Sequence, residues 1–300
     1  MDKLTYYFFR GFVFLFGIAP FRLVYLFSDG FYYILYYIIG YRKKVVFDNL
    51  SSSFPGKTRD EIIKIEKAFY RHFCDIMIES GKAFMMDEGT ITKRFRFTNP
   101  RVLNDYYDQK RNVIVVGGHY NNWEWAGLAS GSQLKHKPVG FYKPLSNKYI
   151  DQYIQKTRVR GRSVLASIKR TTESFHLYQE PCVFYMVADQ SPSNIRMAHW
   201  VNFLGQDTAF LHGPEKHAKA NNLPVYYADI QKIKRGYYAV EFILVEAEPL
   251  TAAPGSITAK YAKILEQKII EKPEFWLWSH RRWKHRPEGM KVRRYEGMKV

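Results

Sequence analysis

The sequence predicts an α/β fold in which a mostly parallel central sheet is flanked by helices. The first indication is the run 112–116, which is short, β-branched and closed by two glycines, as expected for a buried strand. The second is the apolar run 182–188, which ends in a polar pair. A third is the aromatic-rich stretch 6–41, which predicts a membrane-associated helical segment in front of the α/β domain.

The segments around these runs predict further helices and strands. Residues 58–61 form a capping-box pattern, and apolar side chains then recur at helical spacing as far as Ile76. A chain of 300 residues buries roughly three quarters of its unfolded surface, so one domain is sufficient. The other expected elements are a helix from 123, a strand at 138–144, a helix at 147–160, and a β-hairpin made of 224–230 and 239–245.

The most informative chemical signal is an imidazole and a carboxylate five positions apart, at His119 and Glu124. His119 follows strand 112–116, and open α/β sheets bind ligands in the crevice at the carboxyl ends of their strands. A neutral imidazole there can accept the proton of an attacking alcohol. Glu124 would fix the ring tautomer and stabilise the imidazolium, so this pair indicates acyl transfer.

The nucleophile is expected to be the hydroxyl of the substrate. The chain has no Gly-x-Ser-x-Gly elbow, because Ser130 and Ser132 lack the flanking glycine spacing. Direct transfer is therefore favoured over an acyl-enzyme. Taken alone, His-x4-Glu is a weak pattern, since His119 could simply end a strand while Glu124 is a solvated helix residue.

Several blocks along the chain, taken with this pair, form a recognisable series. The blocks are 49–55, 118–124, 142–144, 158–161, 188–190, 202–208 and 276–287. Together they resemble the lipid A late acyltransferases, the lauroyl and myristoyl transferase branch of the lysophospholipid acyltransferase superfamily. The resemblance runs from about residue 42 to residue 289, and the closing block, rich in Trp, Arg and His, is its most specific part.

The resemblance implies a membrane-associated enzyme that moves a fatty acyl chain from an acyl carrier protein thioester to a hydroxyl of a lipid A precursor, late in lipid A biosynthesis. It implies an acyltransferase domain at 46–289, preceded by a membrane-association segment at 1–45 and followed by a basic tail at 290–300. An amino-acid lipid or a lysophospholipid as acceptor would use the same pair of residues. The alternative outside enzymes is a basic protein that binds a membrane or nucleic acid. No cofactor and no metal are expected.

The resemblance also extends the candidate site beyond His119 and Glu124. Arg158 or Arg160 would polarise the thioester carbonyl or grip a phosphate, and spacing does not choose between them. Asp189 and Gln190 would contact substrate or hold the surroundings of His119, although a turn capped by Asp189 explains them equally well. The phosphates of the acceptor would meet the cations of the closing block, namely Arg281, Arg282 and Lys284.

The formal net charge of +18 indicates anionic partners. Residues 6–41 contain sixteen Phe or Tyr and no Trp, a start unusual for a nucleic-acid binder, so nucleic acid is not expected. The uncharged runs 11–21 and 30–41 are shorter than the ~20 residues of a clean spanning helix. We therefore expect interfacial seating on the cytoplasmic face of the bacterial inner membrane, on an anionic surface, with one tilted span as the alternative.

The cysteines and paired histidines suggest no metal centre at the level of sequence. Cys74 and Cys182 stand alone in apolar stretches, as expected for buried thiols in a reducing compartment. The pairs His212/His217 and His280/His285 have no Cys or acidic partner at motif spacing, which argues against structural zinc.

Overall fold

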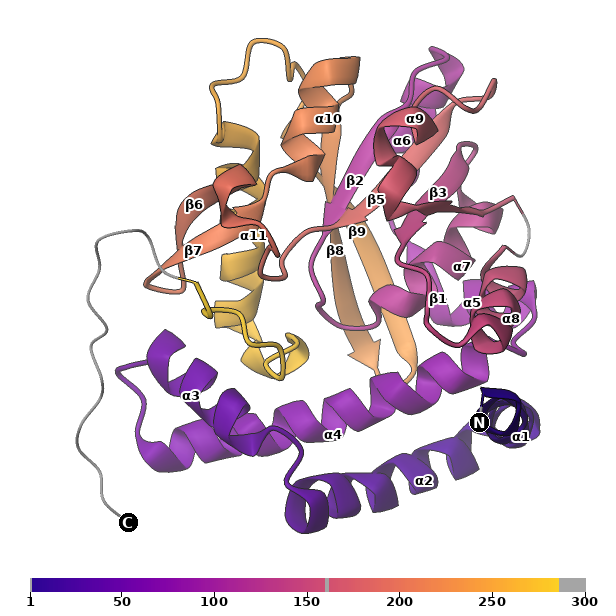
Figure 1. The fold of residues 1–300 in the computed structure, drawn as a ribbon, viewed down its shortest axis with the longest axis vertical. Coiled ribbons are helices and arrows are strands. Elements are labelled where there is room, and N and C mark those ends of the chain that lie inside the picture. The colour runs from indigo at the N-terminus through magenta and orange to yellow at the C-terminus, as the bar shows by residue number, and fades with distance from the viewer. Residues whose placement is uncertain (1, 160–161, 286–300) are drawn as a thin grey trace.

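A computed structural model describes residues 2–159 and 162–285 and confirms the α/β architecture (Figure 1). The strands are β1 (Phe95–Phe97), β2 (Val113–Gly117), β3 (Lys137–Tyr142), β4 (Val164–Ser167), β5 (Cys182–Val187), β6 (Ala198–Phe203), β7 (Gln206–Leu211), β8 (Val225–Lys234) and β9 (Tyr237–Glu246). Seven of them form one sheet in the order β1-β9-β8-β2-β5-β3-β4. Its neighbouring strands are parallel except for the antiparallel hairpin β8–β9.

Helices enclose this sheet. They are α1 (Asp2–Ile18), α2 (Phe21–Tyr33), α3 (Lys43–Ser53), α4 (Arg59–Ala83), α5 (Glu88–Arg94), α6 (Arg101–Asp108), α7 (Trp123–Gln133), α8 (Lys148–Arg158), α9 (Thr171–Ser174), α10 (Gly213–Asn221) and α11 (Ser256–Glu271). Short helical turns are η1 (Ile34–Ile39), η2 (Ile168–Arg170), η3 (Ile195–Met197) and η4 (Pro273–Phe275). In Figure 1, α4 crosses below the sheet, and α1 and α2 pack on the outer side of α4.

The elements with strong local signals form as expected. Thr58 caps α4 through the predicted capping box with Glu61. On the apolar side of α4, Ile62, Phe69 and Ile76 are buried. The expected strands at 112–116, 138–144 and 182–188 correspond to β2, β3 and β5, and the hairpin corresponds to β8–β9. Cys74 and Cys182 are free and buried, as predicted.

The small two-stranded sheet β6–β7 was not anticipated from the sequence. Its strands are joined by Leu204 and Gly205, whose φ angles of 52° and 73° lie in the left-handed region. A two-residue turn of this kind matches the twist of the flanking strands, and glycine adopts it without a steric penalty. The hairpin packs on α11 and leads directly into α10.

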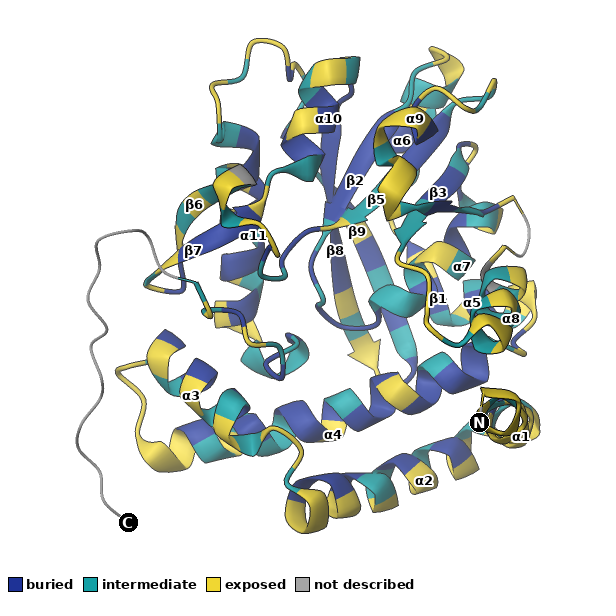
Figure 2. Ribbon diagram, viewed as in Figure 1, coloured by how far each residue is buried: buried dark blue, intermediate teal, exposed yellow. Residues whose placement is uncertain are grey.

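The N-terminal helices expose an unusual amount of apolar surface. Figure 2 shows α1 and α2 exposed along their outer sides, whereas much of α4 is buried. Val13 and Val24 point inward and are buried. Of the helices that the structure describes, none is by itself long and apolar enough to cross a membrane. Residues 21–39 and α3 together have the length and composition of a span, but a bend of 93° separates them. The exposed apolar side chains here include Leu4, Tyr7, Phe8, Phe14, Leu15, Ile18, Leu26, Phe27, Ile38 and Ile39.

Candidate active site

The register of two neighbouring strands places His119 beside Asp189. Strands β2 and β5 are parallel, and Gly117 pairs with Val187 at their carboxyl ends. His119 and Asp189 each lie two residues beyond that pair, so both leave the same edge of the sheet at the same level. The site therefore follows from the pairing of segments far apart in the sequence, at the edge where open α/β sheets bind ligands.

His119 and Asp189 make two hydrogen bonds with each other. The Nδ1 of His119 lies 2.6 Å from Oδ1 of Asp189, and the backbone N–H of His119 donates to Oδ2 at 2.8 Å. The indole N–H of Trp276 also donates to Oδ2, at 2.8 Å. Gly118 permits this close approach, because a Cβ there would lie 2.9 Å from Leu265 and 3.2 Å from the carboxylate.

The electrostatics of this pair suit a general base. Burial opposes the charge on Asp189, but the charge of His119 and the hydrogen bonds from His119 and Trp276 lower its pKa to about 2. Burial lowers the pKa of His119, but the nearby charge and hydrogen bond of Asp189 outweigh it, so that pKa is raised above 6.5. An ionised Asp189 accepts the Nδ1 proton, which leaves Nε2 as the basic nitrogen.

Glu124 does not occupy the position that the sequence suggested. Asp189, and not Glu124, is the carboxylate at Nδ1 of His119, while Nε2 lies 3.1 Å from Nε2 of Gln190. Glu124 lies in the first turn of α7, lines the same cavity, and its charge contributes to the raised pKa of His119. The correction is one of role: the expected pair becomes a histidine with two carboxylates, and the polar residues after strand 182–188 supply its closer partner.

The loop between His119 and Glu124 is fixed by buried asparagines. The side chain of Asn122 caps α7 by accepting from the backbone N–H of Trp125 at 3.1 Å, and it donates to Glu79 at 2.7 Å. Asn121 has a φ of 53° and donates to the carbonyl of Ile230 at 2.7 Å. These bonds set the direction in which α7 leaves the sheet, and hence the distance from Glu124 to His119.

The C-terminal segment closes the other side of this loop. The backbone N–H of Asn121 donates to the carbonyl of Phe275, and the N–H of Leu277 donates to the carbonyl of His119. Between these bonds, Tyr120 and Trp276 pair as an isolated antiparallel β-bridge. Sequence reasoning had assigned this tryptophan-rich block to substrate phosphates. Its role in holding the loop 119–122 is not evident from the sequence, because these contacts depend on the packing of distant segments.

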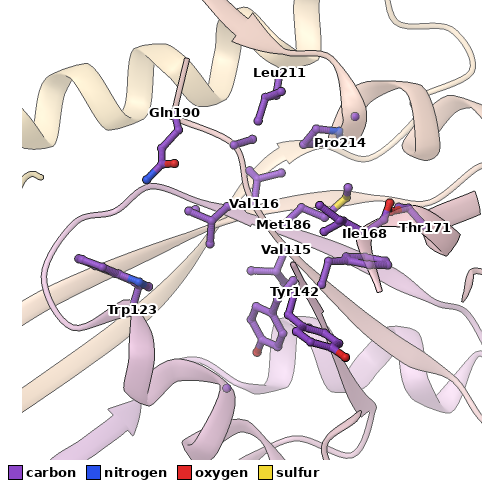
Figure 3. Close-up of a pocket in the computed structure, with 18 of the residues that line it drawn as sticks. Val115, Val116, Trp123, Tyr142, Ile168, Thr171, Met186, Gln190, Leu211 and Pro214 are labelled. Atoms are coloured by element: carbon purple, nitrogen blue, oxygen red, sulfur yellow. The ribbon is translucent and has the colours of Figure 1, made fainter. Parts of the chain in front are cut away.

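A cavity of about 960 Å³ opens beside His119. Figure 3 shows Gln190 and Trp123 at one end of the view and Ile168 and Thr171 at the other. Its inner lining is largely apolar and comes from the strand ends and the segments after them: Val115, Val116, Phe141, Tyr142, Val164, Leu165, Ile168, Met186, Leu211 and Pro214. A polar mouth with an apolar interior fits a ligand that has a reactive polar group and a hydrocarbon chain.

The structure places the basic residues that were candidates for the site in different environments. Arg158 is the last residue of α8, and its side chain and all of Arg160 lie outside the described residues. Arg281 and Lys284 are exposed, so they remain available to an anionic ligand. These two and Arg282 are absent from the described lining of the cavity.

Arg282 is not the solvent-facing phosphate ligand that the sequence suggested. It is 2% exposed, its Nη1 donates to the carbonyl of Ala209 at 2.8 Å, and its guanidinium lies 4.5 Å from the ring centre of Phe210. Burial lowers its pKa to about 10. Arg282 therefore points inward and holds β7 against the C-terminal segment.

The fold and site together define an α/β protein in which a histidine paired with a buried carboxylate lines a largely apolar cavity. A family model described as bacterial lipid A biosynthesis acyltransferase matches residues 1–285. The chain therefore belongs to this family and is an acyltransferase.

Relatives from other bacteria agree with this assignment. The chain is 23% identical over 249 residues to the lipid A biosynthesis palmitoleoyltransferase of Escherichia coli (strain K12), covering 83% of this chain and 80% of the relative. It is 22% identical over 275 residues to the lipid A biosynthesis lauroyltransferase of the same organism, covering 91% and 89%. A lipid A biosynthesis acyltransferase of Haemophilus influenzae is 22% identical over 242 residues, covering 80% and 76%.

Proposed function

We propose that this protein transfers a fatty acyl chain from an acyl carrier protein thioester to a hydroxyl of a lipid A precursor, at a late step of lipid A biosynthesis. The observation that carries the proposal is His119, which is paired with a buried carboxylate and stands at the mouth of a cavity of about 960 Å³ with an apolar interior. The family and the named activities of its relatives support the class of acceptor.

In this mechanism the acceptor hydroxyl displaces the amide of Gln190 from Nε2 of His119 and gives its proton to that nitrogen. The alcohol oxygen then attacks the thioester carbonyl, and a tetrahedral oxyanion forms. Its collapse breaks the carbon–sulfur bond, and the imidazolium returns the proton to the leaving thiolate. The products are an ester and a free carrier thiol, so protons and electrons balance.

The surrounding residues have separate tasks in this scheme. Asp189 holds the Nδ1 proton and stabilises the imidazolium, as the acid of a serine protease triad does. Glu124 adds negative charge near the ring. Arg158 or Arg160 stabilises the oxyanion or grips a phosphate, and Arg281 and Lys284 supply exposed positive charge.

The charge and surface of the chain suit the proposed partners and location. A net charge of +18 favours association with an acidic carrier protein and with anionic lipid. The exposed apolar side of α1, α2 and η1 would lie in the cytoplasmic face of the inner membrane. We propose that residues 1–45 form this membrane-association segment and that the acyltransferase domain follows at 46–289, with 290–300 as a basic tail.

Mass spectrometry of lipid A from a bacterium with and without the gene tests the proposal. We expect the deletion strain to lack one acyl chain and the wild-type gene to restore it. The variant His119→Ala should not restore the chain, because it removes the base, and its purified form should turn over at least about 100-fold more slowly.

The matched control for this experiment is His176→Ala, which changes an exposed histidine of the same domain. It should restore the missing chain, and both variants should give the circular dichroism spectrum of the wild type. Wild-type turnover by His119→Ala would contradict the mechanism. Loss of an acyl chain from an amino-acid lipid or a phospholipid, with lipid A unchanged, would contradict the proposed acceptor.

A further inference from the structure

Three potential ligands meet beside the cavity, away from His119. His199 lies on β6 and pairs with Phe210 of β7, and His212 follows the end of β7. Glu215 lies in the first turn of α10. The hairpin thus folds His199 back onto His212 and Glu215, and one donor atom from each residue lies within 4.8 Å of the other two. Sequence spacing conceals this group, because His199 belongs to no local motif with the others.

The two imidazoles of this group have unused nitrogen atoms. Nε2 of His199 and Nδ1 of His212 are buried, and neither has a hydrogen-bond partner among the described residues. The rings are 4.3 Å apart between centroids and lie at 84° to each other. A buried polar atom without a partner is destabilising, because it has lost its hydrogen bonds to water. Two such atoms beside the same carboxylate indicate that a ligand completes the group.

Glu215 is a carboxylate held in place by its own hydrogen bonds. It is fully buried, and Oε1 lies 3.9 Å from Nε2 of His199. Oε1 accepts from the N–H of Gly255 at 2.5 Å, while Oε2 accepts from the N–H and hydroxyl of Thr258 at 2.9 and 2.8 Å. Each carboxylate oxygen has two lone pairs, and the hydrogen bond from Gly255 uses one of those on Oε1. Oε1 therefore has a second lone pair that can bind a ligand. Outer contacts of this kind orient the ligands of metal sites.

We propose that His199, His212 and Glu215 form a binding site for a divalent transition metal, with Zn²⁺ the best match. Two imidazole nitrogens and one carboxylate oxygen are ligands that suit Zn²⁺, and they do not suit Mg²⁺ or Ca²⁺. Ligands around tetrahedral Zn²⁺ are roughly 3.4 Å apart. The 3.9 Å separation of His199 and Glu215 is close to this, and small rotations of the side chains bring the third ligand in.

The metal would join three parts of the fold at one wall of the cavity. It would tie β6 to the start of α10 and, through the hydrogen bonds of Glu215, to the start of α11. His212 and its neighbours Leu211 and Gly213 line the cavity. The site therefore fixes the wall that the acyl chain contacts, and this proposal stands whether or not the acceptor is a lipid A precursor.

Metal binding by the full-length protein tests the proposal directly. The protein carries a histidine-free tag, is stripped with EDTA, and is dialysed against roughly micromolar Zn²⁺. We expect about one equivalent of zinc by elemental mass spectrometry, and a visible absorption band of tetrahedral coordination when Co²⁺ replaces Zn²⁺. His199→Ala and His212→Ala should each lose the zinc and the band, while His176→Ala should keep both.

The controls separate loss of ligand from loss of fold. Glu215→Ala is avoided because Glu215 also holds the start of α11. If an alanine variant does not give the wild-type circular dichroism spectrum, His199→Gln and His212→Gln replace it at similar volume. Zinc that fails to bind the wild type, or that binds all of these variants equally, would overturn the proposal. Rates of acylation do not enter this test, so it is independent of the proposed function.

Discussion

At the scale of single residues, the site depends on the contact between His119 and Asp189. Asp189 is 2% exposed and accepts hydrogen bonds from the ring and the backbone of His119 and from Trp276. An anion buried this deeply fixes both the orientation and the tautomer of the ring. The charge of Glu124, which lines the same cavity, also raises the pKa of His119.

Asp189→Asn should reduce turnover by about 10³- to 10⁴-fold, because the amide no longer fixes the ring in the reactive tautomer. In the wild type, His119 must lose its proton to act as a base, so activity rises with pH through a value above 6.5. Once the negative charge of Asp189 is removed, burial is the main influence on the pKa of His119 and lowers it. The acid limb of kcat/KM should therefore move to lower pH, as a profile from pH 5 to 9 would show.

Glu124→Gln is the matched control for this profile. The charge of Glu124 is the smallest of the influences on the pKa of His119, so its removal should move the acid limb less than Asp189→Asn does. An acid limb that stays in place in Asp189→Asn, or that moves further in Glu124→Gln, would contradict the assignment of Asp189 to Nδ1.

The sequence predicted which residues belong to the site better than it predicted how they pair. His119, Glu124, Asp189 and Gln190 all follow strands or begin helices with clear local signals, and the structure brings them together. Their pairing depends on the register between β2 and β5, which are far apart in the sequence. The inward turn of Arg282 was unpredictable for the same reason, since local alternation does not reveal which side a loop presents to the core.

At the scale of elements, the exposed side of α1, α2 and η1 is the most unusual surface of the molecule. Phe8 is 72% exposed, Leu15 63% and Ile38 78%, although each is strongly apolar. Contiguous apolar surface of this kind marks interaction with lipid or protein. Its inner side packs on α4, so the helices are anchored while their outer side is free to enter a membrane.

The double variant Phe8→Glu and Ile38→Glu should bind vesicles that contain phosphatidylglycerol about tenfold or more weakly than the wild type does. The change removes apolar area that would enter the lipid, and it adds negative charges that the anionic lipid repels. Both positions are exposed, so the thermal midpoint of unfolding should barely change. Sedimentation with vesicles gives the measurement. Leu250→Glu, at a 63% exposed site after β9, is the control and should bind as wild type does. Equal binding by all three proteins would exclude α1 and η1 as the contact surface.

The elements that were predicted share strong local patterns. A capping box predicted α4, a β-branched run predicted β2, and an apolar run predicted β5. The three-residue strand β1 and the hairpin β6–β7 were missed. β1 is too short to show a period, and β6 carries polar residues on both sides. Strands of this kind are specified mainly by their neighbours in the fold.

At the scale of the whole molecule, Glu79 joins the N-terminal helices to the loop 119–122, which carries the proposed base. It is fully buried on α4 and accepts hydrogen bonds from Tyr25 of α2, Asn122 of the loop and Tyr238 of β9, at 2.7 to 2.8 Å. An ion pair adds to this connection, since Arg235 contacts both Asp29 of α2 and Asp75 of α4. The proposed membrane segment is thus hydrogen-bonded, through Glu79 of α4, to Asn122 in the loop that follows His119.

Glu79 should make folding stability fall as pH rises. Burial raises its pKa to about 7 from an ordinary 4.5, so the folded protein binds a proton that the unfolded chain has lost between these values. This stabilisation is complete below pH 4.5 and is lost as pH rises through 7, a change of roughly 3 kcal/mol. Glu79→Gln cannot ionise, so its stability relative to wild type should increase between pH 5 and pH 7.5.

Urea unfolding at both pH values measures this difference, since other titrating groups are common to the two proteins. Glu88→Gln, which changes an exposed glutamate, should follow the wild-type pH dependence. A Glu79→Gln curve that runs parallel to wild type would show that Glu79 is ionised at both pH values. Sequence patterns do not single out this residue, because a glutamate on the core side of α4 is recognised only when its three partners are in place.

The hydrogen bonds between the loop at His119 and the segment at Phe275 and Leu277 make the alignment of the imidazole depend on residues outside the sheet. On the proposed mechanism, the ring is aimed at its substrate only when this segment is docked. A chain with the segment undocked would keep the strands that line the apolar cavity but would lose the alignment of its proposed base.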